Sequence, residues 1–160
     1  ISKEGENEVA VFKNRKLGAS LRAGGYNILF LHKPEMSIYF AIAFGGSCGA
    51  VCRYWVSTST NRWLGEGFPY GTLTVNLIGS IVVGFLTILF ADRLNVSNEV
   101  RLGLIVGFLG AFTTFSTFAL DTVYLIDNGA ILKAVTYGLF SVVLSVLGVW
   151  AGILAAKQYF

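Results

Sequence analysis

The stretch LGLIVGFLGAFTTFSTFAL, residues 102–120, decides the fold because it is long, apolar and free of charged side chains. A helix needs about 20 mostly apolar residues to cross the hydrocarbon core of a bilayer. Three further stretches have similar length and composition, at residues 37–56, 72–91 and 134–156. Short polar connections join them. The sequence therefore predicts an all-α membrane protein with four transmembrane helices.

The composition supports this fold class. Only 13% of the residues are charged and 54% are hydrophobic, whereas soluble domains average about 25% charged residues. The formal net charge of +3 does not indicate nucleic acid, because from Met36 onward six Lys and Arg residues face five Asp and Glu residues. This near-balance of charge leaves no basic patch that would bind nucleic acid. We therefore expect the lipid bilayer, and not nucleic acid, as a partner.

The first 35 residues differ from the rest of the chain. They hold ten of the charged residues, and the only methionine, Met36, stands where the first apolar stretch opens. The apolar run YNILFL, residues 26–31, is too short for the core of a secretory leader. We expect residues 1–35 to be an extension that is disordered or non-native, and residues 36–160 to form the transmembrane domain, with Met36 as the natural start.

Hydroxyl groups and phenyl rings interleave after a glycine in the segment from Gly110 to Phe118. Glycine, β-branched threonine and serine all weaken an α-helix, so this pattern predicts that the third helix is broken near its middle. Non-helical backbone at membrane depth is tolerated only where it is buried in protein or lines an aqueous cavity. Its carbonyls would then face a hard monovalent cation or water. The alternative is an unbroken helix whose hydroxyls bond back to its own carbonyls.

The second and fourth stretches carry polar side chains at one-turn spacing. Thr72 and Asn76 share a face of the second helix, and Tyr137, Ser141 and Ser145 form a line along the fourth. Asn76 either contributes its amide to a polar track inside the bundle or joins two helices by a hydrogen bond. Three of the predicted helices together offer one track of uncharged donors.

The rings of Phe115 and Phe118 accompany these donors. A phenyl ring carries a positive edge, so ring edges together with N–H and O–H groups can replace part of the hydration shell of an anion. This lining suits a small anion better than a cation. Two charged residues lie near it: Arg53 either snorkels or attracts anions, and Asp121 either pairs with a basic group or reaches the interface.

Small residues predict close packing and a partner subunit. Glycines four residues apart allow membrane helices to approach closely. Such pairs are Gly45 with Gly49, Gly103 with Gly107, and Gly148 with Gly152. Four helices form a slender bundle, whose remaining faces an antiparallel second copy would cover. Basic residues outside the extension are split almost evenly between the two sides of the membrane, so without the extension we expect insertion in both orientations.

Three motifs occur in order: GGSCGAVCRYW at residues 45–55, GTLTVNLIG at residues 71–79 and TTFSTF at residues 113–118. In this combination they resemble the fluoride channel family called Fluc or CrcB, over residues 36–160. The resemblance implies a fluoride-selective channel that exports cytoplasmic fluoride passively and so protects against fluoride toxicity. It further implies a multi-pass protein of the cell inner (plasma) membrane, an antiparallel dual-topology homodimer with two pores, and a central structural sodium ion (Na+).

The resemblance also implies roles for particular residues, by their place in the motifs. Backbone carbonyls of Gly110 and Thr113 would hold the sodium ion. The other functional residues would be the pore amide Asn76, the pore phenylalanines Phe115 and Phe118, the vestibule residue Arg53, and Ser116, Tyr137 and Ser141 on the polar track.

The chain departs from the family pattern at three positions. Ala111 stands in place of a glycine in the break, Ala119 in place of a serine after the second phenylalanine, and Asp121 in place of glutamate. The hydroxyl at position 119 is therefore missing, and we give that position no role.

Three other functions make different demands on the sequence. A small multidrug exporter also has four short spans but needs a carboxylate in the first one, and residues 37–56 contain none. We expect no enzyme, because the single histidine, His32, lies outside the apolar stretches and the sequence has no cluster of metal ligands. A non-conducting scaffold is the third, and vesicle permeability distinguishes it from a channel.

Overall fold

The structure is a computed structural model that describes residues 36–94 and 96–159, so the predicted extension, residues 1–35, lies outside the described residues. The described part is helical. In chain order its helices are α2 (Met36–Leu64), α3 (Tyr70–Ile88), the π-helix η1 (Leu89–Arg93), α4 (Asn98–Leu102), the π-helix η2 (Gly103–Leu109), α5 (Gly110–Phe112), α6 (Phe115–Asp127) and α7 (Ile131–Tyr159).

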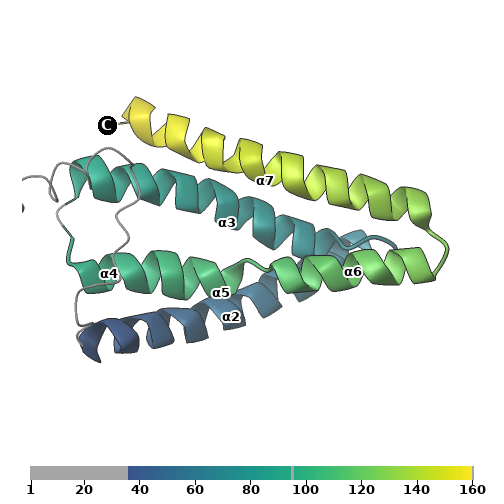
Figure 1. Cartoon of the computed structure of the whole chain (residues 1–160), viewed down its shortest axis with the longest axis horizontal. Helices are drawn as coiled ribbons and strands as arrows, with labels where there is room; N and C mark the ends of the chain where they lie inside the picture. Colours follow the sequence, from purple (N-terminus) through teal and green to yellow (C-terminus); the bar gives the residue numbers. More distant parts are fainter. Residues whose placement is uncertain (1–35, 95, 160) are drawn as a thin grey trace, which may run out of the picture. The chain divides into compact units, whose positions relative to one another are not determined.

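Four helical segments are long and apolar enough to cross a membrane: Met36–Leu64, Tyr70–Ala91, Asn98–Asp127 and Ile131–Tyr159. The prediction of four membrane-spanning helices is therefore confirmed. The third segment is built from α4, η2, α5 and α6 in line (Figure 1). α3 and α7 run side by side, and α2 packs mainly against η2.

Glycines set the closest helix crossings. A Cβ atom at Gly49 would overlap the carbonyl of Phe108 in η2, and one at Gly152 in α7 would overlap the carbonyl of Ile81 in α3. A Cβ atom at Gly45 or Gly107 would likewise overlap a backbone carbonyl across the α2–η2 crossing, whereas the nearest atoms to one at Gly103 or Gly148 are 3.1 Å or more away. The role of the predicted glycine pairs in close packing is therefore confirmed, because a larger residue would push the backbones apart.

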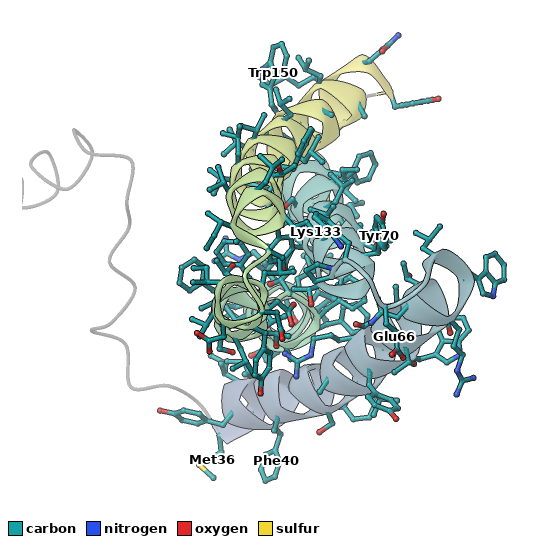
Figure 2. All side chains as sticks on the ribbon, turned by 90° about the vertical axis from the view of Figure 1, so that its right-hand side faces the viewer. Met36, Phe40, Glu66, Tyr70, Lys133 and Trp150 are labelled. Atoms are coloured by element: carbon teal, nitrogen blue, oxygen red, sulfur yellow. The ribbon has the colours of Figure 1, made fainter. Side chains whose placement is uncertain are left out.

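Two short connections lie at one end of the bundle, the end that faces the viewer in Figure 2. Gly65, with a φ of 87°, follows α2, and Gly129, with a φ of 72°, follows α6. After α6 the amide of Gly129 bonds to the carbonyl of Ile126 and the amide of Ala130 to that of Leu125, which is a Schellman motif. The Nζ atom of Lys133, in the first turn of α7, donates to the carbonyl of Gly67 at 2.9 Å and so links α7 to the connection after α2.

Most large apolar side chains point away from the bundle. Phe40 on α2 is 70% exposed and Trp150 on α7 is 60% exposed, and both project outward in Figure 2. Within the described part of the chain, the largest side chains that are fully buried are those of Val75 and Tyr137. This surface is the one that a lipid bilayer or a second apolar subunit would cover.

Candidate functional site

Two extended residues interrupt the third membrane segment. Thr113 has φ −86° and ψ 160°, and Thr114 has φ −155° and ψ 120°, between α5 and α6 (Figure 1). Thr114 is the N-cap of α6, because its Oγ1 atom accepts from the amide of Thr117 at 3.1 Å. The amide and the hydroxyl of Thr113 both donate to the carbonyl of Leu109, each at 3.0 Å. Local hydroxyl bonds thus end one helix and start the next.

The side chain of Asn76 on α3 hydrogen-bonds to the backbone of this interruption. Its Nδ2 atom donates to the carbonyl of Thr114 at 3.0 Å, and the amide of Thr114 donates to Oδ1 at 2.8 Å. An asparagine amide has two N–H donors, so one of them is left by this ring of two hydrogen bonds. Asn76 therefore joins two helices and still presents a donor.

Gly79 lies one turn after Asn76 on the same face of α3. A Cβ atom at this position would overlap the methyl group of Thr113. Glycine is thus required here for α3 to lie against the interruption. Sequence reasoning named Asn76 but missed Gly79 and Thr114. Their signal was present, because residues three apart on a helix share a face.

A cavity of about 490 Å³ opens beside the interruption, between α3, the third segment and α7. It is lined by Asn76, Gly79, Ser80, Val83, Ile105, Leu109, Gly110, Thr113, Thr114, Phe115, Phe118, Ser141, Val142, Ser145 and Val146. We call it the central groove. Six of the nine residues predicted for the site line it, and none of its lining residues is charged.

Ser141 is the one buried polar side chain that the central groove leaves without a partner. It is 6% exposed, and its Oγ atom makes no hydrogen bond with the residues that the structure describes. An unsatisfied buried hydroxyl costs about 1–3 kcal/mol. A hydroxyl in this position therefore favours a ligand in the groove that accepts a hydrogen bond, such as water or an anion.

Aromatic rings extend from the central groove towards the end of the bundle. The ring centroids of Phe115 and Phe118 are 5.4 Å apart, and those of Phe118 and Tyr137 are 5.2 Å apart. Tyr137 in turn meets Phe68 edge to face at 5.5 Å. These distances are typical of favourable aromatic pairs. Phe115 is 78% exposed, so the outer ring of the series is not covered within the subunit.

Tyr137 lies one turn from Ser141 and outside the central groove. Its hydroxyl donates to Oδ2 of Asp121 at 3.2 Å, and the hydroxyl of Thr72 donates to the same oxygen at 2.7 Å. Asp121 is thus held by two hydroxyl groups. It also lines a second cavity of about 320 Å³, together with Thr72, Asn61 of α2 and Glu66 of the connection after α2.

The remaining two predicted residues do not line either cavity. Ser116 is exposed, and its Oγ atom lies 3.3 Å from Oγ1 of Thr114. Arg53 is half-buried on α2 and makes no hydrogen bond or ion pair with any residue in the described ranges. The central groove therefore brings together Gly110, Thr113, Asn76, Phe115, Phe118 and Ser141. Tyr137 and Ser116 border the groove without lining it, through Phe118 and Thr114 respectively, and Arg53 does not line it.

Known proteins resemble the chain over the same region. Similar proteins include "Fluoride-specific ion channel FluC" of Methylococcus capsulatus, 48% identical over 119 residues, which are 74% of this chain and 52% of that protein. The protein of the same name from Hydrogenovibrio crunogenus is 46% identical over 120 residues, 75% of this chain and 91% of that protein. "Fluoride-specific ion channel FluC 1" of Nitrobacter hamburgensis is 50% identical over 119 residues, 74% of this chain and 94% of that protein.

The chain thus spans about half the length of the Methylococcus relative and nearly the whole length of the other two. The profile of one protein family, described as CrcB-like protein, camphor resistance (CrcB), matches residues 40–153. These residues include most of each of the four membrane segments, the interruption and every residue that lines the central groove. The chain therefore belongs to the CrcB-like protein family.

Proposed function

We propose that this protein is a channel that lets fluoride cross a membrane passively. The observation that carries the proposal is the central groove, whose lining has uncharged donors and phenyl rings and in which the hydroxyl of Ser141 has no partner among the described residues. The relatives named as fluoride-specific ion channels support it. The family is one of channels, not enzymes.

The lining explains how a small anion would be held. The second N–H of Asn76, the hydroxyl of Ser141 and the ring edges of Phe115 and Phe118, all residues that line the groove, would present positive charge to the anion. None of these groups carries a full charge, so an anion would be bound weakly enough to leave again. Fluoride, the smallest halide, makes the strongest hydrogen bonds with such donors because its charge is the most concentrated.

Passive export needs no coupling residue. Hydrogen fluoride enters a cell as a neutral weak acid and dissociates, and the trapped anion leaves through the channel. An inside-negative potential favours anion exit by about 2.3 kcal/mol per 100 mV. In the inner (plasma) membrane the channel would thereby protect the cell against fluoride.

The functional unit would be an antiparallel homodimer with two pores. The central groove is open, and Phe115 at its edge is 78% exposed, so a second copy would complete the wall. Basic residues flank both ends of the membrane segments, with Arg62 and Lys133 at one end and Arg101 and Lys157 at the other. This balance favours neither orientation and suits a pair of opposed subunits.

A structural sodium ion fits the donors at the interruption. Gly110 and Thr113 both line the groove, and backbone carbonyls are hard oxygen ligands that suit such a cation. Within residues 36–94 and 96–159 no group of three or more His, Cys, Asp or Glu residues could hold a metal ion instead. The ion would supply a fixed positive charge at the middle of the bundle.

Reconstituted protein tests the function directly. Liposomes loaded with potassium fluoride are diluted into fluoride-free buffer, valinomycin carries the compensating potassium, and an electrode records released fluoride. We expect rapid fluoride release, and little release from liposomes loaded with chloride and read with a chloride electrode. If fluoride release were no faster than from fluoride-loaded liposomes without protein, a non-conducting scaffold would be the better description.

A further inference from the structure

Two amide groups at the interruption are bonded to side chains instead of to carbonyls. In a continuous α-helix the amide of residue i+4 donates to the carbonyl of residue i. The amide of Thr114 would serve Gly110, and that of Thr117 would serve Thr113. Here the amide of Thr114 donates to Oδ1 of Asn76 at 2.8 Å, and the amide of Thr117 donates to Oγ1 of Thr114 at 3.1 Å.

We propose that the side chains of Asn76 and Thr114 are positioning residues that keep the carbonyls of Gly110 and Thr113 available to a cation. They do so by capturing the two amides that would otherwise bond to these carbonyls. The inference rests on the proposed sodium site. It assigns to Asn76 a second task besides facing the groove, and to Thr114 a task that its place in the motif does not reveal.

Further contacts hold Thr113 and Thr114 in this conformation. Asn76 also donates to the carbonyl of Thr114 at 3.0 Å, so the backbone of Thr114 is held by two bonds and not one. Oγ1 of Thr114 additionally donates to Oγ1 of Thr117 at 3.0 Å. Gly79 admits the methyl group of Thr113 against α3. α3 thus holds the interruption in its extended conformation. The third segment cannot become one continuous helix while these hydrogen bonds persist.

Thr114 is a better position than Asn76 for testing this task. Both residues line the groove, but only Asn76 is also proposed to donate to the anion. Valine has nearly the shape of threonine but no hydroxyl, so Thr114→Val releases the amide of Thr117 to the carbonyl of Thr113. Thr114→Ser keeps the capturing oxygen and is the matched control. Asn76→Leu, which removes the other capture at similar size, provides a second variant should Thr114→Val not fold.

The test measures sodium binding by its effect on stability. The full-length protein and the variants are purified in detergent, and the midpoint of thermal unfolding is followed while sodium replaces N-methylglucamine at constant ionic strength. We expect the midpoint of the unchanged protein to rise with sodium. Because a competing hydrogen bond must now be broken, Thr114→Val and Asn76→Leu should need about tenfold more sodium for the same response. Thr114→Ser should stay within about twofold.

The outcomes separate the two proposals. If the unchanged protein, Thr114→Val and Asn76→Leu all needed the same sodium concentration for half of the full response, the positioning role alone would be overturned. No sodium response in the unchanged protein would remove the sodium site and the positioning role with it. Fluoride release from liposomes is recorded on the same preparations, so a protein that binds sodium but does not conduct would contradict only the channel.

Discussion

The hydroxyl of Tyr137 on α7 donates to Oδ2 of Asp121 on α6 at 3.2 Å, inside an otherwise apolar bundle. Thr72 donates to the same oxygen, so Tyr137→Phe would leave the carboxylate one donor. We expect it to lower the free energy of unfolding by about 1 kcal/mol, as measured by thermal unfolding in detergent.

The matched control is Tyr137→Leu, which also removes the ring that contacts Phe118 and Phe68. It should cost about 1 kcal/mol more than Tyr137→Phe. Equal losses for the two variants would mean that the rings add nothing to stability.

The contact between Gly79 and Thr113 predicts that a smaller residue at position 113 offsets the effect of a larger one at position 79. Gly79→Ala places a Cβ atom against the methyl group of Thr113, and we expect a loss of about 1–3 kcal/mol of stability. Thr113→Ser removes that methyl group and keeps the hydroxyl that bonds to Leu109. The double variant should therefore recover most of the loss in a double-mutant cycle.

Gly138→Ala is the control for the cost of alanine itself, because a Cβ atom at Gly138 meets nothing within 4 Å. It should leave stability unchanged or raise it by up to about 1 kcal/mol, because alanine is favoured over glycine inside a helix such as α7. If Thr113→Ser failed to restore Gly79→Ala, the two side chains would not be in the contact that the structure describes.

Substitutions in the central groove test the anion path. Phe115→Ile and Phe118→Ile each remove a ring with a positive edge from the lining, and Asn76→Ala removes an amide donor. We expect each to slow fluoride release from liposomes by about tenfold or more, equivalent to about 1.4 kcal/mol in the barrier. Size-exclusion elution should show that the assembly is kept. Release at the unchanged rate in all three would place the path elsewhere.

Ser141 distinguishes a functional hydroxyl from a structural one. Its Oγ atom has no partner among the described residues, so Ser141→Ala removes an unsatisfied buried donor. The variant should be as stable as the unchanged protein or more stable, by up to about 1 kcal/mol, and should conduct fluoride more slowly. A less stable variant with unchanged fluoride release would instead assign the hydroxyl to packing.

Opposed subunits predict symmetrical labelling. Glu66 is exposed in the connection after α2, so Glu66→Cys can be labelled by a maleimide that does not cross membranes, after Cys48 and Cys52 are replaced by serine. In a variant that begins at Met36, we expect about half of the protein in cells to be labelled from outside, because the basic residues from Met36 onward set no preferred orientation. Labelling close to none or close to all would contradict dual topology.

Composition predicts the membrane segments because hydropathy depends on local sequence alone. It does not predict where helices end. The first apolar stretch stops at Val56, yet α2 continues through serine and threonine residues to Leu64, because Gly65 with its positive φ, and not a loss of hydropathy, ends it.

The candidate site could be predicted only in part for a related reason. Asn76 and Phe118 stand out in the sequence as unusual residues in apolar stretches, and both line the central groove. Thr114 and Gly79 do not stand out, since one is a threonine among several and the other a glycine among many. Their importance arises from the approach of α3 to the third segment, a tertiary contact that sequence spacing does not reveal.

The link between Thr72 and Asp121 was missed in the same way. An aspartate in a membrane segment requires donors, and the sequence suggested a basic partner or the interface. Two hydroxyl groups supply them instead. Hydroxyls are common in these helices, so only the packing of α3, α6 and α7 could select which ones.

The length of α2 has a consequence for the membrane that surrounds the protein. Its 29 residues make a rod of about 44 Å, whereas the hydrocarbon core is about 30 Å thick. The excess must be absorbed by tilt or by projection, and the hydroxyl-rich turns after Val56 are the part of α2 that headgroups can solvate. The second cavity, whose rim includes Asn61, would then stand at the depth of lipid headgroups. Bilayer thickness would thus govern how readily ions in solution reach this end of the bundle.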